Sequence, residues 1–179
     1  GFAGWAVEHG PRARSIPGFG LWQTIAAGAL AARLPLGDAA VIDLSTSLKF
    51  RDRHIPGAWW AVRARLDAAR ARIPDARTIV LASEDGVLAH LAASDAAALW
   101  PAAEVRVLEG GNAAWFAANP ATESGIANAT TSLDDVWYKP YDHEHGSDYE
   151  KHAREYLSWE VALVDQIKRE PSVRFRACD

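Results

Sequence analysis

The sequence predicts an α/β domain built around a central, mostly parallel β-sheet. Short apolar runs rich in β-branched residues alternate with longer segments of helical character up to about residue 118. This spacing is typical of strand–helix units, in which helices connect parallel strands and cover the faces of the sheet. The 179 residues, 49% of them hydrophobic, also suffice to bury one ordinary core without metal or disulfide staples.

Each element is predicted from its own pattern of residues. Apolar runs of strand length predict strands near 40–44, 58–61, 78–82 and 104–108. Alanine-rich or amphipathic runs predict helices over 21–34, 63–72, 86–99 and 112–118. Because ligands bind beyond the carboxyl ends of parallel strands, the loops after Asp43 and Ala82 are the candidate site.

The chain divides into three parts. Residues 1–20 are rich in proline and glycine and predict a linker or the tail of a preceding domain, 21–125 predict the α/β domain, and 126–179 predict an extended strap and a C-terminal helix. That helix should span 147–170, end before Pro171, and bury Tyr156, Trp159, Leu163 and Ile167.

The N-terminal residues contain a run that is repeated, in part, later in the sequence. The run Gly1-Phe2-Ala3-Gly4-Trp5 is echoed by Gly111-Asn112-Ala113-Ala114-Trp115, and the sequence contains no methionine. A chance echo in a chain rich in alanine, glycine and tryptophan is one interpretation. The other, which we favour, is a fragment or processed module of a longer protein with a preceding homologous domain.

Composition excludes several classes of function. The net charge of −4 gives no basic surface for nucleic acid and no polybasic membrane patch. No apolar run approaches the roughly 20 residues that span a bilayer, and we expect a cytoplasmic protein. The one cysteine, Cys178, excludes a disulfide within the chain and is expected to be a bystander.

Three ordered motifs between about residues 38 and 125 resemble the rhodanese family of sulfurtransferases. They are Val41-Ile42-Asp43 followed by Phe50 and His54-Ile55-Pro56-Gly57-Ala58, the strand Thr78 to Ala82 before the active-site loop, and Leu108-Glu109-Gly110-Gly111 followed by Trp115. The resemblance implies a rhodanese-like three-layer domain. The C-terminal helical extension is similar to one in tandem-domain members of the family.

The active-site loop departs from the family pattern. That loop begins with a cysteine, has a glycine three residues later, and often carries Arg or Thr two residues after that. The matching run is Ser83-Glu84-Asp85-Gly86-Val87-Leu88, so serine replaces the cysteine and leucine the Arg or Thr. The family-motif positions that remain as candidate binding residues are Asp43, Ser45, His54, Gly57 and Gly86; Ser45 replaces a usual arginine, and His54 is expected to shape a turn.

These departures affect the residues that would carry out sulfur transfer. Sulfur transfer in the family stores sulfur as a cysteine persulfide, which needs a thiolate, and the hydroxyl of Ser83 cannot form one. Glu84 and Asp85 would each repel an anion at about 4 Å by about 1 to 4 kcal/mol. Alternatively they only cap the following helix, which we favour.

We therefore expect a non-catalytic structural or regulatory module of a multidomain thiosulfate sulfurtransferase-like protein, with other rhodanese-like domains of the same polypeptide as partners and no cofactor. One alternative is a sulfurtransferase whose reactive cysteine comes from another domain, and another is a module that binds a small anion or a peptide at the degenerate loop. A hydrolase using Ser83 is disfavoured because His90 lies about two helical turns away, roughly 10 Å.

A metal site is also disfavoured. Asp142-His143-Glu144-His145, with Asp148 and His152 nearby, matches no zinc spacing, and we expect a solvated polar loop there.

Overall fold

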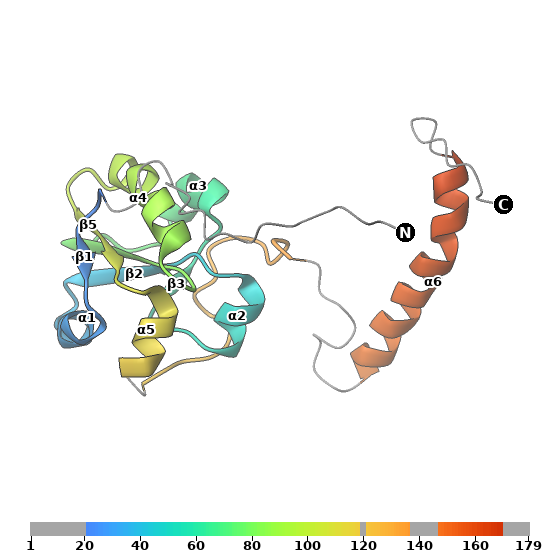
Figure 1. Ribbon diagram of the computed structural model, residues 1–179, viewed down its shortest axis with the longest axis horizontal. Coiled ribbons are helices and arrows are strands. Elements are labelled where there is room, and N and C mark those ends of the chain that lie inside the picture. Colours follow the sequence, from blue (N-terminus) through green and yellow to red (C-terminus); the bar gives the residue numbers. More distant parts are fainter. Residues whose placement is uncertain (1–20, 119–120, 137–146, 170–179) are drawn as a thin grey trace, which may run out of the picture. The chain divides into compact units, whose positions relative to one another are not determined.

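The structure is a computed structural model that describes residues 21–118, 121–136 and 147–169 (Figure 1). One compact unit ends at Leu133 and a second begins at Asp134. The predicted linker over 1–20 and the polar run Asp142 to His145 lie outside the described residues.

Within the described residues, five strands form one sheet in which all strand pairs are parallel. The strands are β1 (Thr24–Ile25), β2 (Ala39–Asp43), β3 (Trp59–Trp60), β4 (Thr78–Ala82) and β5 (Glu104–Leu108). Their order is β1-β5-β4-β2-β3, so β4 lies at the centre with β2 on one side and β5 on the other. The four predicted strands and the parallel sheet are therefore confirmed.

Helices cover both faces of this sheet, as the continuous burial of β2 and β4 requires (Figure 1). One face carries α3 (Leu66–Arg70) and α4 (Val87–Leu99), which pack with Ile42, Ile79 and Leu81. The other face carries α1 (Ala27–Arg33), α2 (Ser47–Asp52) and α5 (Gly111–Ala118), which pack with Val41 and Val80. Adjacent strand residues thus enter different cores, and the strands are buried on both sides.

The N-terminal helix prediction is partly wrong. The helix predicted over 21–34 begins only at Ala27, because Thr24–Ile25 forms the edge strand β1 beside β5. The hydrogen bonds that form this edge are Val107 N–H to the Gln23 carbonyl and Glu109 N–H to the Ile25 carbonyl, both 3.0 Å. Tertiary pairing of the β5 backbone overrides the helical pattern of the alanine-rich segment.

Three short helical segments complete the connections of this unit. The 3₁₀ turns are η1 (Leu34–Leu36) and η2 (Arg63–Arg65), and the latter replaces the start of the helix predicted over 63–72. The six-residue helix α2 was not predicted, because only one large apolar side chain, Phe50, anchors it in the core. Its N-terminus is capped by Thr46, whose hydroxyl accepts the Lys49 N–H.

The second unit contains α6 (Ser147–Arg169), which confirms the predicted C-terminal helix. Large apolar side chains on α6 are exposed, among them Leu157, Trp159, Val164 and Ile167. The predicted burial of this face stays a prediction. No helix among the described residues is both long and apolar enough to cross a membrane.

Candidate functional site

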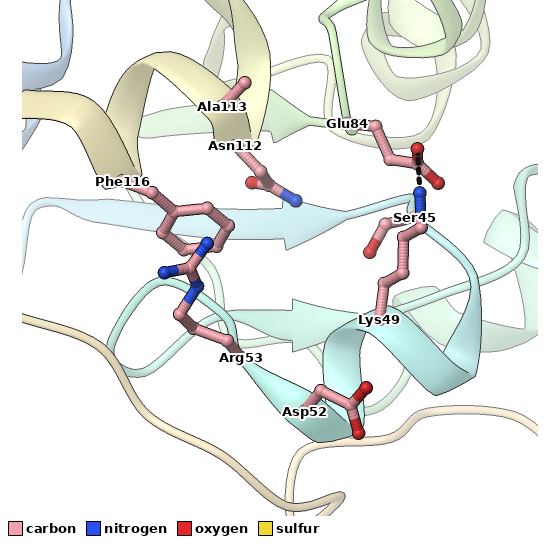
Figure 2. A pocket seen from close by; sticks show the side chains of 8 residues that line it. All are labelled: Ser45, Lys49, Asp52, Arg53, Glu84, Asn112, Ala113 and Phe116. Carbon is pink, nitrogen blue, oxygen red and sulfur yellow. Dashed lines mark hydrogen bonds and ion pairs between the residues drawn. The ribbon is translucent and has the colours of Figure 1, made fainter. Parts of the chain in front are cut away.

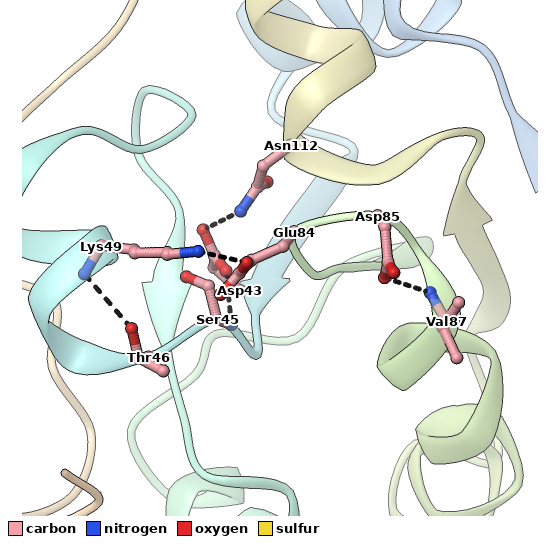
Figure 3. Close-up of polar contacts among 8 residues, drawn as sticks. All are labelled: Asp43, Ser45, Thr46, Lys49, Glu84, Asp85, Val87 and Asn112. Carbon is pink, nitrogen blue, oxygen red and sulfur yellow. Dashed lines mark hydrogen bonds and ion pairs between the residues drawn. The ribbon is translucent and has the colours of Figure 1, made fainter. Parts of the chain in front are cut away.

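The two candidate loops lie side by side at the carboxyl edge of the sheet (Figure 3). Asp43, the last residue of β2, pairs in register with Ala82, the last residue of β4. The Leu44 N–H then donates to the Ala82 carbonyl at 2.9 Å. The segments that follow, 44–46 and 83–86, therefore start from adjacent points, as expected for a ligand site in a parallel sheet.

The 83–86 loop rests directly on the Gly110-Gly111 pair that follows β5. Asn112 N–H donates to the Ser83 carbonyl at 2.8 Å, and Ala113 N–H donates to the Glu84 carbonyl at 3.1 Å. A Cβ at Gly111 would lie only 2.2 Å from the Ser83 carbonyl oxygen, and this glycine has φ of +62°. Glycine is needed here because both the left-handed backbone and the close approach exclude a side chain.

Ser83 is buried, with 3% of its surface exposed. Its Oγ accepts the Ala89 N–H at 3.3 Å, and the Asp85 carboxylate accepts the Val87 N–H at 2.9 Å. Asp85 thus caps the start of α4, the interpretation favoured from the sequence. The Val87 and Ala89 amides at this helix terminus are therefore already hydrogen-bonded by the chain's own side chains.

Glu84 forms an ion pair with Lys49 of α2, which joins the two loops (Figure 3). Both side chains are about half exposed, so the pair contributes at most about 1 kcal/mol to stability. The adjacent Lys49 cation also offsets part of the repulsion that Glu84 alone would exert on an anion. Sequence reasoning missed Lys49, which lies 35 residues before its partner.

Asp43 is fully buried beneath the loops. Its carboxylate accepts the Ser45 N–H and the Asn112 Nδ2–H, both at 2.8 Å. Burial raises the pKa of Asp43, and the hydrogen bonds from Ser45 and Asn112, with the nearby His54, partly oppose that rise. Asp43 therefore ties the first loop to the start of α5, and Asn112 is a site residue that sequence reasoning did not assign.

His54 and Gly57 both contact Glu123 in the segment after α5, and the turn-shaping role of His54 stays a prediction. The His54 ring stacks on Phe50 with centroids 3.8 Å apart, and Nδ1 lies 2.6 Å from the Phe50 carbonyl oxygen, so Nδ1 donates the hydrogen bond. His54 and Glu123 exchange backbone hydrogen bonds of 2.8 and 3.0 Å. The Glu123 carboxylate accepts the Gly57 N–H at 2.8 Å, so both residues hold the segment after α5 against the sheet.

Two neighbouring pockets open at the loops. The larger, of about 380 Å³, lies between α2 and α5 and is lined by Ser45, Lys49, Asp52, Arg53, Glu84, Asn112, Ala113 and Phe116 (Figure 2). The smaller, of about 280 Å³, is lined by Leu44, Ser45, Thr46, Ser83, Glu84, Asp85 and Leu88.

The structure thus gathers part of the predicted site and separates the rest. Ser45, Ser83, Glu84, Asp85 and Leu88 line the pockets, whereas His54 and Gly57 line neither. Gly86, with φ of +85°, sets the backbone at the loop's end, where a Cβ would approach the Leu108 carbonyl oxygen to 3.3 Å. Val87 takes part through its backbone as the first residue of α4.

Among the described residues, no group of three or more His, Cys, Asp or Glu side chains is arranged to hold a metal ion. Cys178 lies outside the described residues.

Comparison with known proteins identifies a family model that matches most of the first unit. The model, described as Rhodanese-like domain, matches residues 26–118. No curated protein matches the sequence.

Two solved structures are also similar to this chain. The crystal structure of thiosulfate sulfurtransferase from Pseudomonas aeruginosa is 32% identical, with a TM-score of 0.76, over 88% of this chain and 30% of that one. A rhodanese-like domain from Anabaena sp., solved by NMR, is 26% identical with a TM-score of 0.50, over 69% of this chain and 97% of that one. This chain therefore spans about 30% of the length of the Pseudomonas relative.

Proposed function

Because the chain belongs to the rhodanese-like domain family, we propose that it is a non-catalytic structural or regulatory module of a multidomain thiosulfate sulfurtransferase-like protein. The observation that carries this proposal is Ser83, which stands at the end of β4, where the family pattern has its reactive cysteine. The residue that should hold the transferable sulfur is thus a serine.

Serine cannot replace the cysteine in this reaction. A thiolate attacks the donor and then holds the sulfur as a persulfide, and it is appreciably ionised near neutral pH. A serine hydroxyl is not ionised there, and an oxygen–sulfur product would not have the reactivity of a persulfide. The Ser83 hydroxyl is also buried and accepts a hydrogen bond from the Ala89 N–H.

The surroundings of Ser83 add a second obstacle. The Val87 and Ala89 amides donate to the side chains of Asp85 and Ser83, so an anionic donor would have to displace those contacts. The Asp85 carboxylate also opposes the approach of an anion. Both features support a loop that no longer receives thiosulfate.

The proposed partners are other rhodanese-like domains of the same polypeptide. This proposal rests on the similarity to the Pseudomonas thiosulfate sulfurtransferase, of which this chain covers only 30%. In the alternative that we retain, another domain contributes the reactive cysteine and this module completes the site. The two pockets at the loops favour a further alternative, a module that binds a small ligand or a peptide.

The test is sulfur transfer from thiosulfate to cyanide, measured on the chain and on variants. The wild type should show none above background, and Ser83→Cys should show at most weak turnover. The combination of Ser83→Cys, Glu84→Gln, Asp85→Asn and Leu88→Arg should turn over faster, because it removes two carboxylates and adds a cationic group.

Ser94→Cys is the matched control, because it adds a thiol to the exposed side of α4 outside the loop. It should stay at the wild-type level, and circular dichroism should confirm that every variant is folded. Robust turnover by the wild type that persists in Ser83→Ala would contradict a non-catalytic module.

A further inference from the structure

The helix α6 exposes large apolar side chains over a broad face. Those on this face, each between 36% and 59% exposed, are Tyr149, Leu157, Trp159, Val164 and Ile167. Most helical stability in proteins comes from packing an apolar face rather than from the helix itself. Contiguous exposed apolar patches therefore mark interaction surfaces. The apolar face of α6 is such a patch.

The centre of this face repeats with a spacing of alternately four and three residues. The residues at this spacing, which we call the α6 seam, are Tyr149, Ala153, Tyr156, Glu160, Leu163 and Ile167. The same spacing keeps side chains on one side of a helix and allows two helices to pack along their length. Glu160 is the one charged residue of the seam. The seam therefore suits a second helix, and Glu160 restricts how that helix can lie.

Glu160 distinguishes a parallel from an antiparallel pair of α6 helices. A parallel pair aligns equal residues, so Glu160 would face Glu160 of the second copy and the two carboxylates would repel each other. In an antiparallel pair centred on Ser158, residues equally far before and after Ser158 lie at one level. Glu160 then lies beside Tyr156 of the second copy, and no two carboxylates meet in the seam. The charge therefore favours the antiparallel pair.

The other seam residues also match one another in the antiparallel pair. Ala153 lies at the level of Leu163 of the second copy, and Tyr149 lies at the level of Ile167. Each of these apolar contacts occurs twice, because a two-fold axis exchanges the two copies. One helix therefore supplies both halves of an apolar interface, which fits a second copy of this chain.

We propose that α6 pairs antiparallel with α6 of a second copy, so that the chain forms a dimer through the α6 seam. This inference goes beyond the proposed function and does not depend on Ser83. Its readouts are mass and cross-linking rather than sulfur transfer, so the two proposals can fail separately.

The first test is sedimentation equilibrium of the full chain. The wild type should associate to twice the 19.4 kDa of one chain. Leu163→Glu places a second carboxylate in the seam and should raise the dimer dissociation constant at least tenfold.

Val161→Glu is the matched control. Val161 is 79% exposed and lies two residues before Leu163, on nearly the opposite side of the helix. This variant should leave the dissociation constant unchanged, and circular dichroism should show equal helix content in both variants. A monomeric wild type, or equal weakening by the two variants, would overturn the proposal.

Disulfide trapping tests the direction of the pair. Ala153→Cys and Leu163→Cys are prepared separately in a chain that also carries Cys178→Ala, and the two are mixed before oxidation. In the antiparallel pair the two copies of Ala153 lie about 15 Å apart along the helix axis, too far for a disulfide. The mixture should therefore give a cross-linked heterodimer, and neither variant alone should cross-link. Cross-linking of Ala153→Cys to itself, or no cross-link in the mixture, would contradict the antiparallel pair.

Discussion

Replacing Gly111 by alanine tests whether the loop from Ser83 to Gly86 depends on close packing against Gly111. The new Cβ would lie 2.2 Å from the Ser83 carbonyl oxygen and 2.5 Å from the Gly86 nitrogen. Both are backbone atoms, so the loop itself has to move. Such a movement breaks the hydrogen bonds that Asn112 N–H and Ala113 N–H donate to it.

The expected cost has two parts. A non-glycine residue at φ of +62° costs about 1–2 kcal/mol. Loss of two backbone hydrogen bonds adds about 1 kcal/mol each. Gly111→Ala should therefore lower the free energy of unfolding by about 3–4 kcal/mol.

Gly37→Ala provides the matched control. Gly37 has φ of +69°, and a Cβ there would meet nothing within 4 Å. It should cost only the backbone part, about 1–2 kcal/mol. Urea unfolding, followed by the fluorescence of buried tryptophans such as Trp60 and Trp115, measures both variants. If Gly111→Ala costs no more than Gly37→Ala, the loop does not rest on Gly111 as described.

Two further predictions concern the groups beneath the loops. Because burial raises the pKa of Asp43, the folded chain binds its proton more tightly than the unfolded chain, whose pKa is about 3.9. The stability difference between the wild type and Asp43→Asn, measured as wild-type minus variant free energy of unfolding, should therefore fall as the pH rises from about 4 through the folded pKa. A difference that rises with pH would contradict this. Trp60→Phe removes the indole N–H, which donates to the Ser45 carbonyl at 2.8 Å in a fully buried position. This variant should lower the free energy of unfolding by about 1–3 kcal/mol in the same urea assay. A change under about 0.5 kcal/mol would show that the first loop does not depend on this hydrogen bond.

The parts of the fold that the sequence predicts are those with a local signature. β2 and β4 are runs of apolar residues buried on both faces, so their positions and their parallel pairing follow from the pattern. β1 has two residues and exists only because β5 offers it a partner, so no local pattern reveals it. The same holds for α2, whose six residues contain a single large buried apolar side chain.

The candidate site divides in a similar way. The loop from Ser83 to Leu88 could be located because it follows a strand and carries a family-like spacing. Asn112 and Lys49 were missed because their partners, Asp43 and Glu84, are 69 and 35 residues away in sequence. A signal for Asn112 was nevertheless present. It follows the Gly-Gly pair after β5, and the carboxyl ends of neighbouring parallel strands meet at one edge.

Mass spectrometry of the intact chain after incubation with thiosulfate tests most directly whether the loop can hold sulfur. The measurement is made with Cys178→Ala, so that the loop is examined without the chain's only thiol. No added sulfur is expected when Ser83 is present. More added sulfur is expected in the quadruple loop variant that contains Ser83→Cys than with Ser83→Cys alone. A stable sulfur adduct that maps to residues 83–88 in the chain that retains Ser83 would contradict this expectation.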